Sequence, residues 1–211
     1  MSKICYIFAA GDFEGSFTPK ENSLIIAADA GYRHAERLSI TPDILLGDFD
    51  TIGEMPDFSD VITFNPEKDY TDTELAIMEG IKRGCCEFVI LGALGGKRLE
   101  HTIGNLALAA SYAEKGYSVT LTDGNYIAKA LHNDSFSLSG ENTGFISLFC
   151  TSGKAEGVSI SGLKYSLSDA VLDSSNPTLC ISNEFCGKDA MISVTKGTVI
   201  IIWQKSKNKQ R

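Results

Sequence analysis

The chain has 211 residues, 43% hydrophobic and 22% charged, so it can bury a sizeable core as one large domain or two small ones. Its formal net charge of −8 argues against nucleic-acid binding, and no apolar run approaches the roughly 20 residues of a membrane span. Six cysteines without a C-x₂-C pair disfavour a disulfide scaffold and a structural zinc site, and with no signal peptide evident we expect a cytoplasmic protein with reduced thiols.

The first half of the chain alternates apolar runs of strand length with helical patterns. We expect strands over residues 4–10, 24–28, 61–64, 87–91 and 118–121, and another short strand that begins after Pro42. We expect helices through residues 33–37 and over 71–83 and 101–115. Strands that alternate with helices predict a mainly parallel sheet with helices on its faces.

From about Asn125 the helical periodicity disappears. Short apolar runs at 144–150, 157–160, 190–194 and 198–203 are separated by Gly, Ser, Asn and Asp. Lys196-Gly197 lies between the last two runs and fits a hairpin turn. This half therefore predicts an antiparallel sandwich or barrel. The fold we expect is a mainly parallel α/β nucleotide-binding domain over residues 1–130, followed by an antiparallel β-sandwich domain over residues 131–211.

Two aspartates follow the short apolar run after Pro42. Asp48 and Asp50 come after Gly47, where the backbone can leave a sheet or turn sharply. Alternation along an extended chain points both carboxylates to the same side, with Cα atoms about 6.5 Å apart. Such a pair of anions is typical of a Mg²⁺ site, although two acids on a solvated turn are the commoner origin of a D-x-D pattern.

A second acidic cluster occupies residues 68–74. Thr71 and Glu74 have the spacing of a capping box, and Asp72 favours the positive end of the helix dipole. Helix capping therefore explains these three residues, but it does not explain Asp69, which precedes the helix. Because a helix N-terminus also attracts anions, the same geometry could receive a metal–phosphate group.

A third stretch, residues 91–101, leaves a strand through three glycines. It then presents Lys97, Arg98 and His101 at the start of a helix. Such a turn allows close backbone approach to phosphate, and an arginine offers a planar fork for phosphate oxygens. The spacing matches neither G-x-x-x-x-G-K-[ST] nor G-x-G-x-x-G, which disfavours a P-loop or a dinucleotide fold. A tight surface turn is the alternative.

All three stretches lie at strand ends or in the loops that follow them. Open α/β sheets bind ligands in the crevice outside the carboxyl ends of their strands. Acids for a metal and bases for phosphate, converging there, indicate phosphoryl transfer from a nucleotide. The residue pattern by itself leads no further.

Five motifs, taken in chain order, resemble the successive signatures of the bacterial thiamine pyrophosphokinase family. They are Ala28-Asp29-Ala30-Gly31, Gly47-Asp48-Phe49-Asp50-Thr51-Ile52, Asp69-Tyr70-Thr71-Asp72-Thr73-Glu74, Arg98-Leu99-Glu100-His101-Thr102 and Ser182-Asn183-Glu184. Each motif is weak alone, but their succession over nearly the whole chain is specific.

The resemblance implies an N-terminal α/β domain that binds ATP and Mg²⁺, a C-terminal β-sandwich, and a homodimer with thiamine near the subunit interface. The implied reaction transfers the diphosphoryl group of ATP to the hydroxyl of thiamine, giving thiamine diphosphate and AMP. The resemblance implies that four aspartates hold or orient Mg²⁺ and the phosphates, namely Asp48, Asp50, Asp69 and Asp72, and that ATP is also contacted by Asp29, Thr71, Arg98 and His101. It implies catalytic roles for Asp50, Asp72 and Arg98. The residues that would face thiamine are Ser182, Asn183 and Glu184.

Three positions depart from the pattern usual in that family. Glu100 stands where aspartate is usual, Ala30 stands where glycine is common, and Lys97 adds a residue between the glycine pair and Arg98. Because the longer Glu100 side chain can reach similar partners with a shifted backbone, we retain the implied function.

Two other functions could be built on the same acids. One is another Mg²⁺-dependent enzyme acting on nucleotides, such as a nucleotidyltransferase or a pyrophosphohydrolase. The other is a non-catalytic nucleotide-sensing module, which would bind ATP without turnover. Formation of AMP only in the presence of thiamine distinguishes a thiamine pyrophosphokinase from both.

Overall fold

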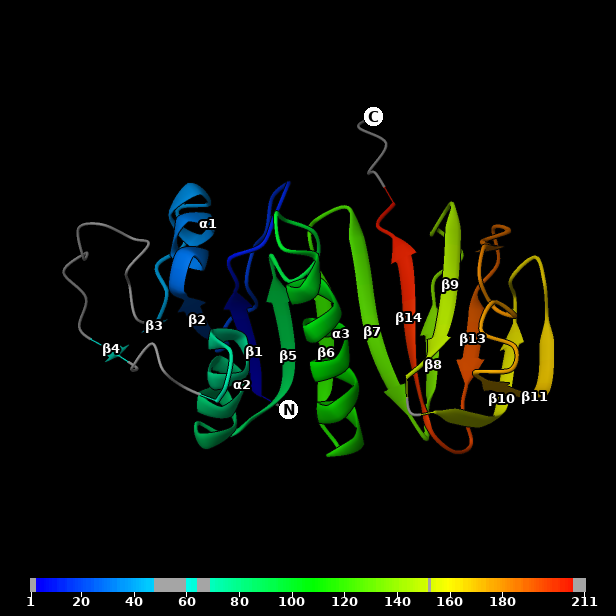
Figure 1. The fold of residues 1–211 in the computed structure, drawn as a ribbon. Coiled ribbons are helices and arrows are strands. Elements are labelled where there is room, and N and C mark those ends of the chain that lie inside the picture. The colour runs from blue at the N-terminus through cyan, green and yellow to red at the C-terminus, as the bar shows by residue number, and fades with distance from the viewer. Residues whose placement is uncertain (1–2, 48–59, 64–68, 152, 207–211) are drawn as a thin grey trace. The chain divides into compact units, whose positions relative to one another are not determined.

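The protein has a mixed α/β fold with more strands than helices (Figure 1). The computed structural model describes residues 3–47, 60–63, 69–151 and 153–206. The chain forms two compact units, one of Met1–Leu108 with Tyr117–Gly124 and one of Ala109–Gly116 with Asn125–Arg211. The domain boundary between residues 130 and 131 stays a prediction.

The described residues of the first unit contain six parallel strands. The strands are β1 (Lys3–Phe8), β2 (Leu24–Ala28), β3 (Ile44–Gly47), β4 (Val61–Thr63), β5 (Cys85–Leu91) and β6 (Ser118–Thr122). Their hydrogen-bonded order is β6-β5-β1-β2-β3-β4, and every pair in it is parallel. The helices are a single 3₁₀ turn over Asp29–Gly31, α1 (Tyr32–Arg37), α2 (Asp72–Lys82) and α3 (Leu99–Glu114), and the last turns of α3 group with the second unit. The predicted parallel pairing in this half is therefore confirmed.

Side chains of β1 show why the sheet is covered on both faces. Tyr6 and Phe8 are buried in one apolar cluster with Ala35 of α1. Cys5, one residue out of phase, lies on the other face, where it approaches Gly80 of α2. Successive side chains of a strand point to opposite faces, so an uninterrupted apolar strand needs a helix on each side. This explains why the strand reads as a continuous apolar run.

The second unit is antiparallel. Its strands are β7 (Tyr126–His132), β8 (Ser135–Leu138), β9 (Phe145–Cys150), β10 (Lys154–Ser161), β11 (Leu167–Asp173), β12 (Asn183–Glu184), β13 (Ala190–Ser193) and β14 (Thr198–Gln204). Within this unit the strands pair in the orders β12-β9-β14-β7 and β11-β10-β13-β8. One apolar core contains side chains from both groups, including Leu148, Val158 and Ile192. Antiparallel strand groups that share one core form the predicted sandwich.

The predicted hairpin at Lys196-Gly197 is wrong. β13 pairs with β10 and β8, whereas β14 pairs with β7 and β9, so the two strands that flank this turn belong to different groups. The Gly197 amide instead donates to Asn133 Oδ1 at 2.8 Å. The turn therefore carries the chain from one group of strands to the other. Among the described residues, no helix is long and apolar enough to cross a membrane.

Candidate functional site

The strand order of the first unit reverses at β1. This strand pairs with β2 on one side and with β5 on the other. β2 is the next strand along the chain, whereas β5 comes only after β3, β4 and α2. Loops that leave two neighbouring strands in opposite directions open a crevice at the carboxyl ends of the strands. A cavity of about 730 Å³ lies there, lined by segments that follow β1, β2 and β5 and by the start of α2.

Five of the predicted site residues line this one cavity. They are Asp29, Thr71, Asp72, Arg98 and His101. Asp69 is exposed before α2 and is not part of the lining. Asp48 and Asp50 lie outside the described residues. The structure thus brings together acids and bases that are up to about 70 residues apart in the sequence, as expected for loops at one edge of a parallel sheet.

Asp29 occupies an unusual backbone conformation, with φ of 45°. Left-handed backbone is uncommon for a residue with a side chain, although aspartate tolerates it better than most. The end of β3 packs closely against it, because a Cβ added to Gly47 would lie 3.2 Å from Asp29 Cα. A glycine at this position therefore allows β3 to end directly beside the backbone of Asp29.

Thr71 performs the capping role predicted for it. It precedes α2 with extended backbone, and its Oγ1 accepts a hydrogen bond from the Glu74 amide at 3.2 Å. Asp72 then begins the helix and lines the cavity. The cap fixes the backbone of the first turn, and Asp72 lines the cavity from that turn. Helix capping by Thr71 and a role for Asp72 at the cavity are therefore compatible.

Arg98 and Glu100 form an ion pair at the start of α3. Arg98 Nε lies 2.7 Å from Glu100 Oε1, and both side chains are about two-thirds exposed, at 68% and 66%. The hydrogen bond from Arg98, followed by the backbone hydrogen bond of Glu100 itself, lowers the pKa of the Glu100 carboxyl. Glu100 therefore stays ionised and pairs with the Arg98 guanidinium. Exposed ion pairs of this kind contribute little to stability.

Four polar residues of the cavity lining were not proposed as site residues from the sequence, and a fifth, Lys97, was noted in the third stretch without a role of its own. The four are Asp12, Arg33, Thr73 and Asn105. Asp12 follows the first predicted strand, so the rule that ligands bind beyond strand ends could have identified it. Asn105 has a structural contact, because its Nδ2 donates to the Ala93 carbonyl at 2.8 Å.

A divalent metal would need carboxylates that converge. Among the residues in the described ranges, no group of three or more His, Cys, Asp or Glu is close enough to hold an ion. Asp29 and Asp72 nevertheless place two carboxylates in the cavity lining. Oxygen donors of this type suit Mg²⁺, which commonly completes its shell with water and substrate phosphates. The metal role of Asp48 and Asp50 stays a prediction.

The predicted thiamine segment lies in the second unit. Asn183 is 4% exposed, and its amide is engaged with backbone: Oδ1 accepts from Tyr165 N at 3.0 Å and Glu184 N at 2.9 Å, and Nδ2 donates to Tyr165 O at 2.7 Å. Glu184 pairs with Lys164, which raises the pKa of that lysine. The Ser182 amide donates to Ser147 Oγ at 3.0 Å. These contacts hold the segment in a fixed position beside Tyr165.

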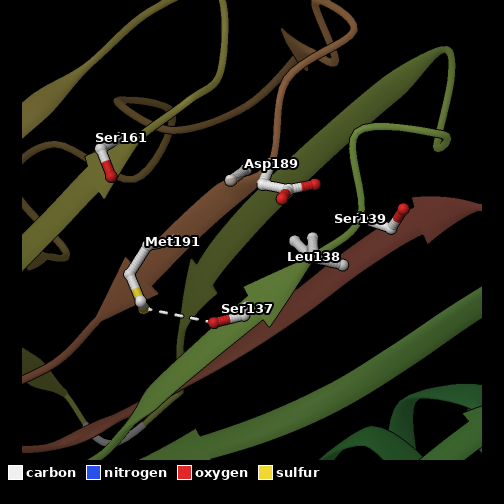
Figure 2. A pocket seen from close by; sticks show the side chains of 7 residues that line it. Ser137, Leu138, Ser139, Ser161, Asp189 and Met191 are labelled. Atoms are coloured by element: carbon white, nitrogen blue, oxygen red, sulfur yellow. Dashed lines mark hydrogen bonds between the residues drawn. The ribbon is translucent and has the colours of Figure 1, made fainter.

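A second cavity, of about 500 Å³, lies on the second unit (Figure 2). Its lining consists of Ser137, Leu138, Ser139, Ser161, Asp189, Ala190 and Met191. The Ser137 hydroxyl donates to Met191 Sδ at 3.6 Å, and Asp189 Oδ1 accepts from the Gly140 amide at 2.8 Å. None of the predicted site residues lines it, and it has one carboxylate and no cation, so the first cavity is the better candidate.

Comparison with known proteins identifies the family. A family model described as thiamin pyrophosphokinase, catalytic domain, matches residues 18–121, and one described as thiamin pyrophosphokinase, vitamin B1 binding domain, matches residues 136–199. Thiamine pyrophosphokinase of Bacillus subtilis is 29% identical over 189 residues, which cover 86% of this chain and 87% of that protein.

Solved structures agree with these matches. The crystal structure of the Bacillus subtilis thiamine pyrophosphokinase superposes with a TM-score of 0.82 at 25% identity, covering 98% of this chain and 100% of that one. A thiamin pyrophosphokinase family protein from Enterococcus faecalis has the same fold, with a TM-score of 0.81 at 24% identity and the same coverage of 98% and 100%. With two consecutive family models spanning most of its length, the chain belongs to the thiamine pyrophosphokinase family.

Proposed function

We propose that this protein transfers the diphosphoryl group of ATP to the hydroxyl of thiamine, releasing AMP. The observation that carries the proposal is the convergence of Asp29, Asp72 and Arg98 on one cavity at the β1/β5 reversal, within the stretch that matches the catalytic family model. The match of residues 136–199 to the vitamin B1 binding model supports thiamine as the acceptor.

The reaction forms one bond and breaks one. The thiamine hydroxyl oxygen bonds to the β-phosphorus of ATP, the bond from that phosphorus to the oxygen bridging to the α-phosphate breaks, and AMP leaves with that oxygen. The hydroxyl proton is released. Negative charge moves toward the leaving AMP during this transfer, so groups fixed around the phosphates contribute mainly by positioning and by electrostatic stabilisation.

In this proposal the predicted site residues divide the tasks of holding the phosphates and the metal. Arg98 pairs with phosphate oxygens, and His101, in the first turn of α3, contacts the same polyphosphate. Asp29 and Asp72 would hold Mg²⁺ together with Asp48 and Asp50, and Asp69, which precedes α2, would contribute to the same ion. Bound Mg²⁺ supplies positive charge that neutralises the phosphate oxygens. A Thr71-capped α2 keeps Asp72 in place with its positive helix end toward the phosphates.

One incubation tests the function. The protein is mixed with ATP, Mg²⁺ and thiamine, and the nucleotide and thiamine products are separated. AMP and thiamine diphosphate should form in equal amounts, and no AMP should form without thiamine. AMP produced in the absence of thiamine would indicate a pyrophosphohydrolase, pyrophosphate release would indicate a nucleotidyltransferase, and binding without turnover would indicate a sensing module.

Replacement of Asn183 by alanine is expected to raise the thiamine KM about three- to tenfold and to leave the ATP KM nearly unchanged. Each lost hydrogen bond costs about 0.5–1.5 kcal/mol, and more where a buried partner stays unpaired. The structure adds a second effect. The side-chain amide of Asn183 bonds both the N–H and the carbonyl of Tyr165, so its removal also frees the backbone at Tyr165. Steady-state kinetics with each substrate varied measures both constants. An unchanged thiamine KM, or an equal rise for ATP, would place the acceptor site elsewhere.

We also expect a homodimer in a cytoplasmic location. β12, which has two residues, is the edge strand of one group in the second unit, and β8 and β11 are the edge strands of the other. Exposed strand edges invite pairing and are commonly covered in the folded assembly. Light scattering across micromolar concentrations should give the mass of two chains. A fully active protein with the mass of one chain would contradict the expectation.

A further inference from the structure

Arg98 and Lys97 both line the first cavity, where we propose that ATP binds, but they differ in their ion pairs. Arg98 is paired with Glu100 at 2.7 Å. Lys97, its neighbour in the loop after β5, lines the same cavity, and within the described part of the chain no ion pair joins its ammonium to a carboxylate. Its side chain is exposed. Lys97 is therefore a cation at the cavity that can meet a ligand without first breaking an ion pair to a described residue.

The residue before Lys97 is held by a carboxylate from far along the chain. Asp12 Oδ2 accepts a hydrogen bond from the Gly96 amide at 2.9 Å. The same loop is held at Gly95, whose carbonyl accepts from Thr102 Oγ1 at 3.3 Å. A glycine-rich loop usually offers its amides to phosphate. Here the Gly96 amide is occupied, so this amide is not offered to phosphate, and a side chain of the loop can make the contact in its place.

The charge of the cavity favours the same contact. Asp12, Asp29 and Asp72 contribute three carboxylates to the lining, alongside the cations Arg33, Lys97 and Arg98, and a polyphosphate brings further negative charge. Like charges within a few ångströms disfavour binding unless cations separate them. Lysine is a compact ammonium on a flexible stem, suited to a phosphate chain as a point charge rather than as a planar fork.

We propose that Lys97 is a second polyphosphate-binding cation beside Arg98, and that Asp12 positions it by clamping the Gly96 amide. Asp12 is then a positioning residue, because it acts on the ligand through the loop. The inference rests on the proposed use of ATP and deepens it, since it assigns the phosphate contacts of this loop to side chains. It also gives a function to the residue that lengthens the loop between the glycine pair and Arg98.

Binding measurements test the role of Lys97 without turnover. The probes are α,β-methylene-ATP, which resists cleavage at the bond that the reaction breaks, and adenosine, which has no phosphate. By calorimetry with Mg²⁺, Lys97→Met should bind the ATP analogue about tenfold more weakly, because a charged hydrogen bond is lost, while adenosine affinity stays within about twofold. Lys97→Arg should retain most of the affinity. Lys20→Met, which removes an exposed lysine outside the cavity lining, is the matched control.

Two variants of Asp12 test positioning against charge. Asp12→Asn keeps an oxygen that can accept from Gly96, so its affinity for the ATP analogue should stay within about twofold of the parent protein. Asp12→Ala removes the acceptor and should weaken binding of the analogue about three- to tenfold, again with adenosine spared. Equal losses in both Asp12 variants would show that the carboxylate charge acts directly, and the positioning role would be wrong.

Each outcome separates this inference from the function on which it rests. If the unaltered protein binds the ATP analogue and forms AMP and thiamine diphosphate, yet Lys97→Met binds the analogue as tightly, the inference is overturned and the function stands. If the unaltered protein binds no ATP analogue, the proposed function itself fails. Loss of analogue and adenosine binding together in Lys97→Met would indicate a collapsed loop and would also overturn the phosphate role.

Discussion

Replacement of Asp72 by asparagine is expected to lower kcat by at least about a hundredfold. The residue begins α2 and lines the cavity that we assign to ATP, where an amide has the same shape but cannot supply the charge of a carboxylate to a metal. Loss of one group that stabilises developing charge in a transition state typically costs a factor of 10²–10³ in kcat. Stability should change by only about 1 kcal/mol or less, the worth of one charge at a helix N-terminus. Steady-state turnover at saturating Mg²⁺ and urea unfolding measure the two effects.

Glu74 provides a matched control in the same turn. It is the other acidic residue in the first turn of α2, and it is not part of the cavity lining. Glu74→Gln removes the same charge from the same helix dipole, and the Thr71 cap, which bonds the Glu74 backbone amide, is preserved. Turnover of this variant should stay within about twofold of the parent protein. Near-normal turnover in Asp72→Asn would mean that the metal and catalytic roles of Asp72 are wrong.

The parallel half of the fold was predictable because its signals are local. Apolar runs of strand length alternate with amphipathic helices, and the structure confirms β2 at Leu24–Ala28 and α2 at Asp72–Lys82, within a residue of the prediction. The convergence of Asp72, Arg98 and His101 followed from a topological rule, since loops at the carboxyl ends of neighbouring strands meet. That rule needs only the order of elements, which the sequence pattern provides.

Contacts between distant residues were not predictable. Asp12 and Gly96 are separated by 84 positions, and no local pattern connects a polar residue after β1 with an amide after β5. The hairpin prediction failed for a related reason, because the strands on either side of Lys196-Gly197 choose their partners by burial in a common core rather than by proximity in the chain. Strand periodicity indicates a strand but does not identify its partner.

The amide of Asn183 shows a second limit. Ser182, Asn183 and Glu184 place a hydroxyl, an amide and a carboxylate in a row. Such groups are typical both of a site for a heteroaromatic cation and of an ordinary polar loop. The structure uses the buried amide to hold Tyr165 through two backbone hydrogen bonds. Residue type specifies which hydrogen bonds a group can make, but only the fold decides which partners it meets.

One glycine determines how closely the 3₁₀ turn after β2 approaches the sheet. Gly31 ends the 3₁₀ turn that begins at Asp29 and has φ of −58°, which any residue can adopt. The requirement for glycine is therefore steric. A Cβ at this position would lie 2.0 Å from the carbonyl oxygen of Phe8 and 2.9 Å from the amide nitrogen of Ala9. Both atoms belong to the backbone at the end of β1, which cannot move away as a flexible side chain could.

Gly31→Ala is accordingly expected to lower the free energy of unfolding by about 3 kcal/mol, the upper part of the usual range for overpacking in a tightly packed interior. The separation of β1 from the turn should also displace Asp29 from the cavity, so the ATP KM should rise. Gly104→Ala is the matched control: it lies inside α3, a Cβ there meets nothing within 4 Å, and alanine should stabilise the helix by about 0.5–1 kcal/mol. Urea unfolding of both variants makes the comparison. Equal stability of Gly31→Ala and the parent protein would show that this backbone contact is looser than the structure describes.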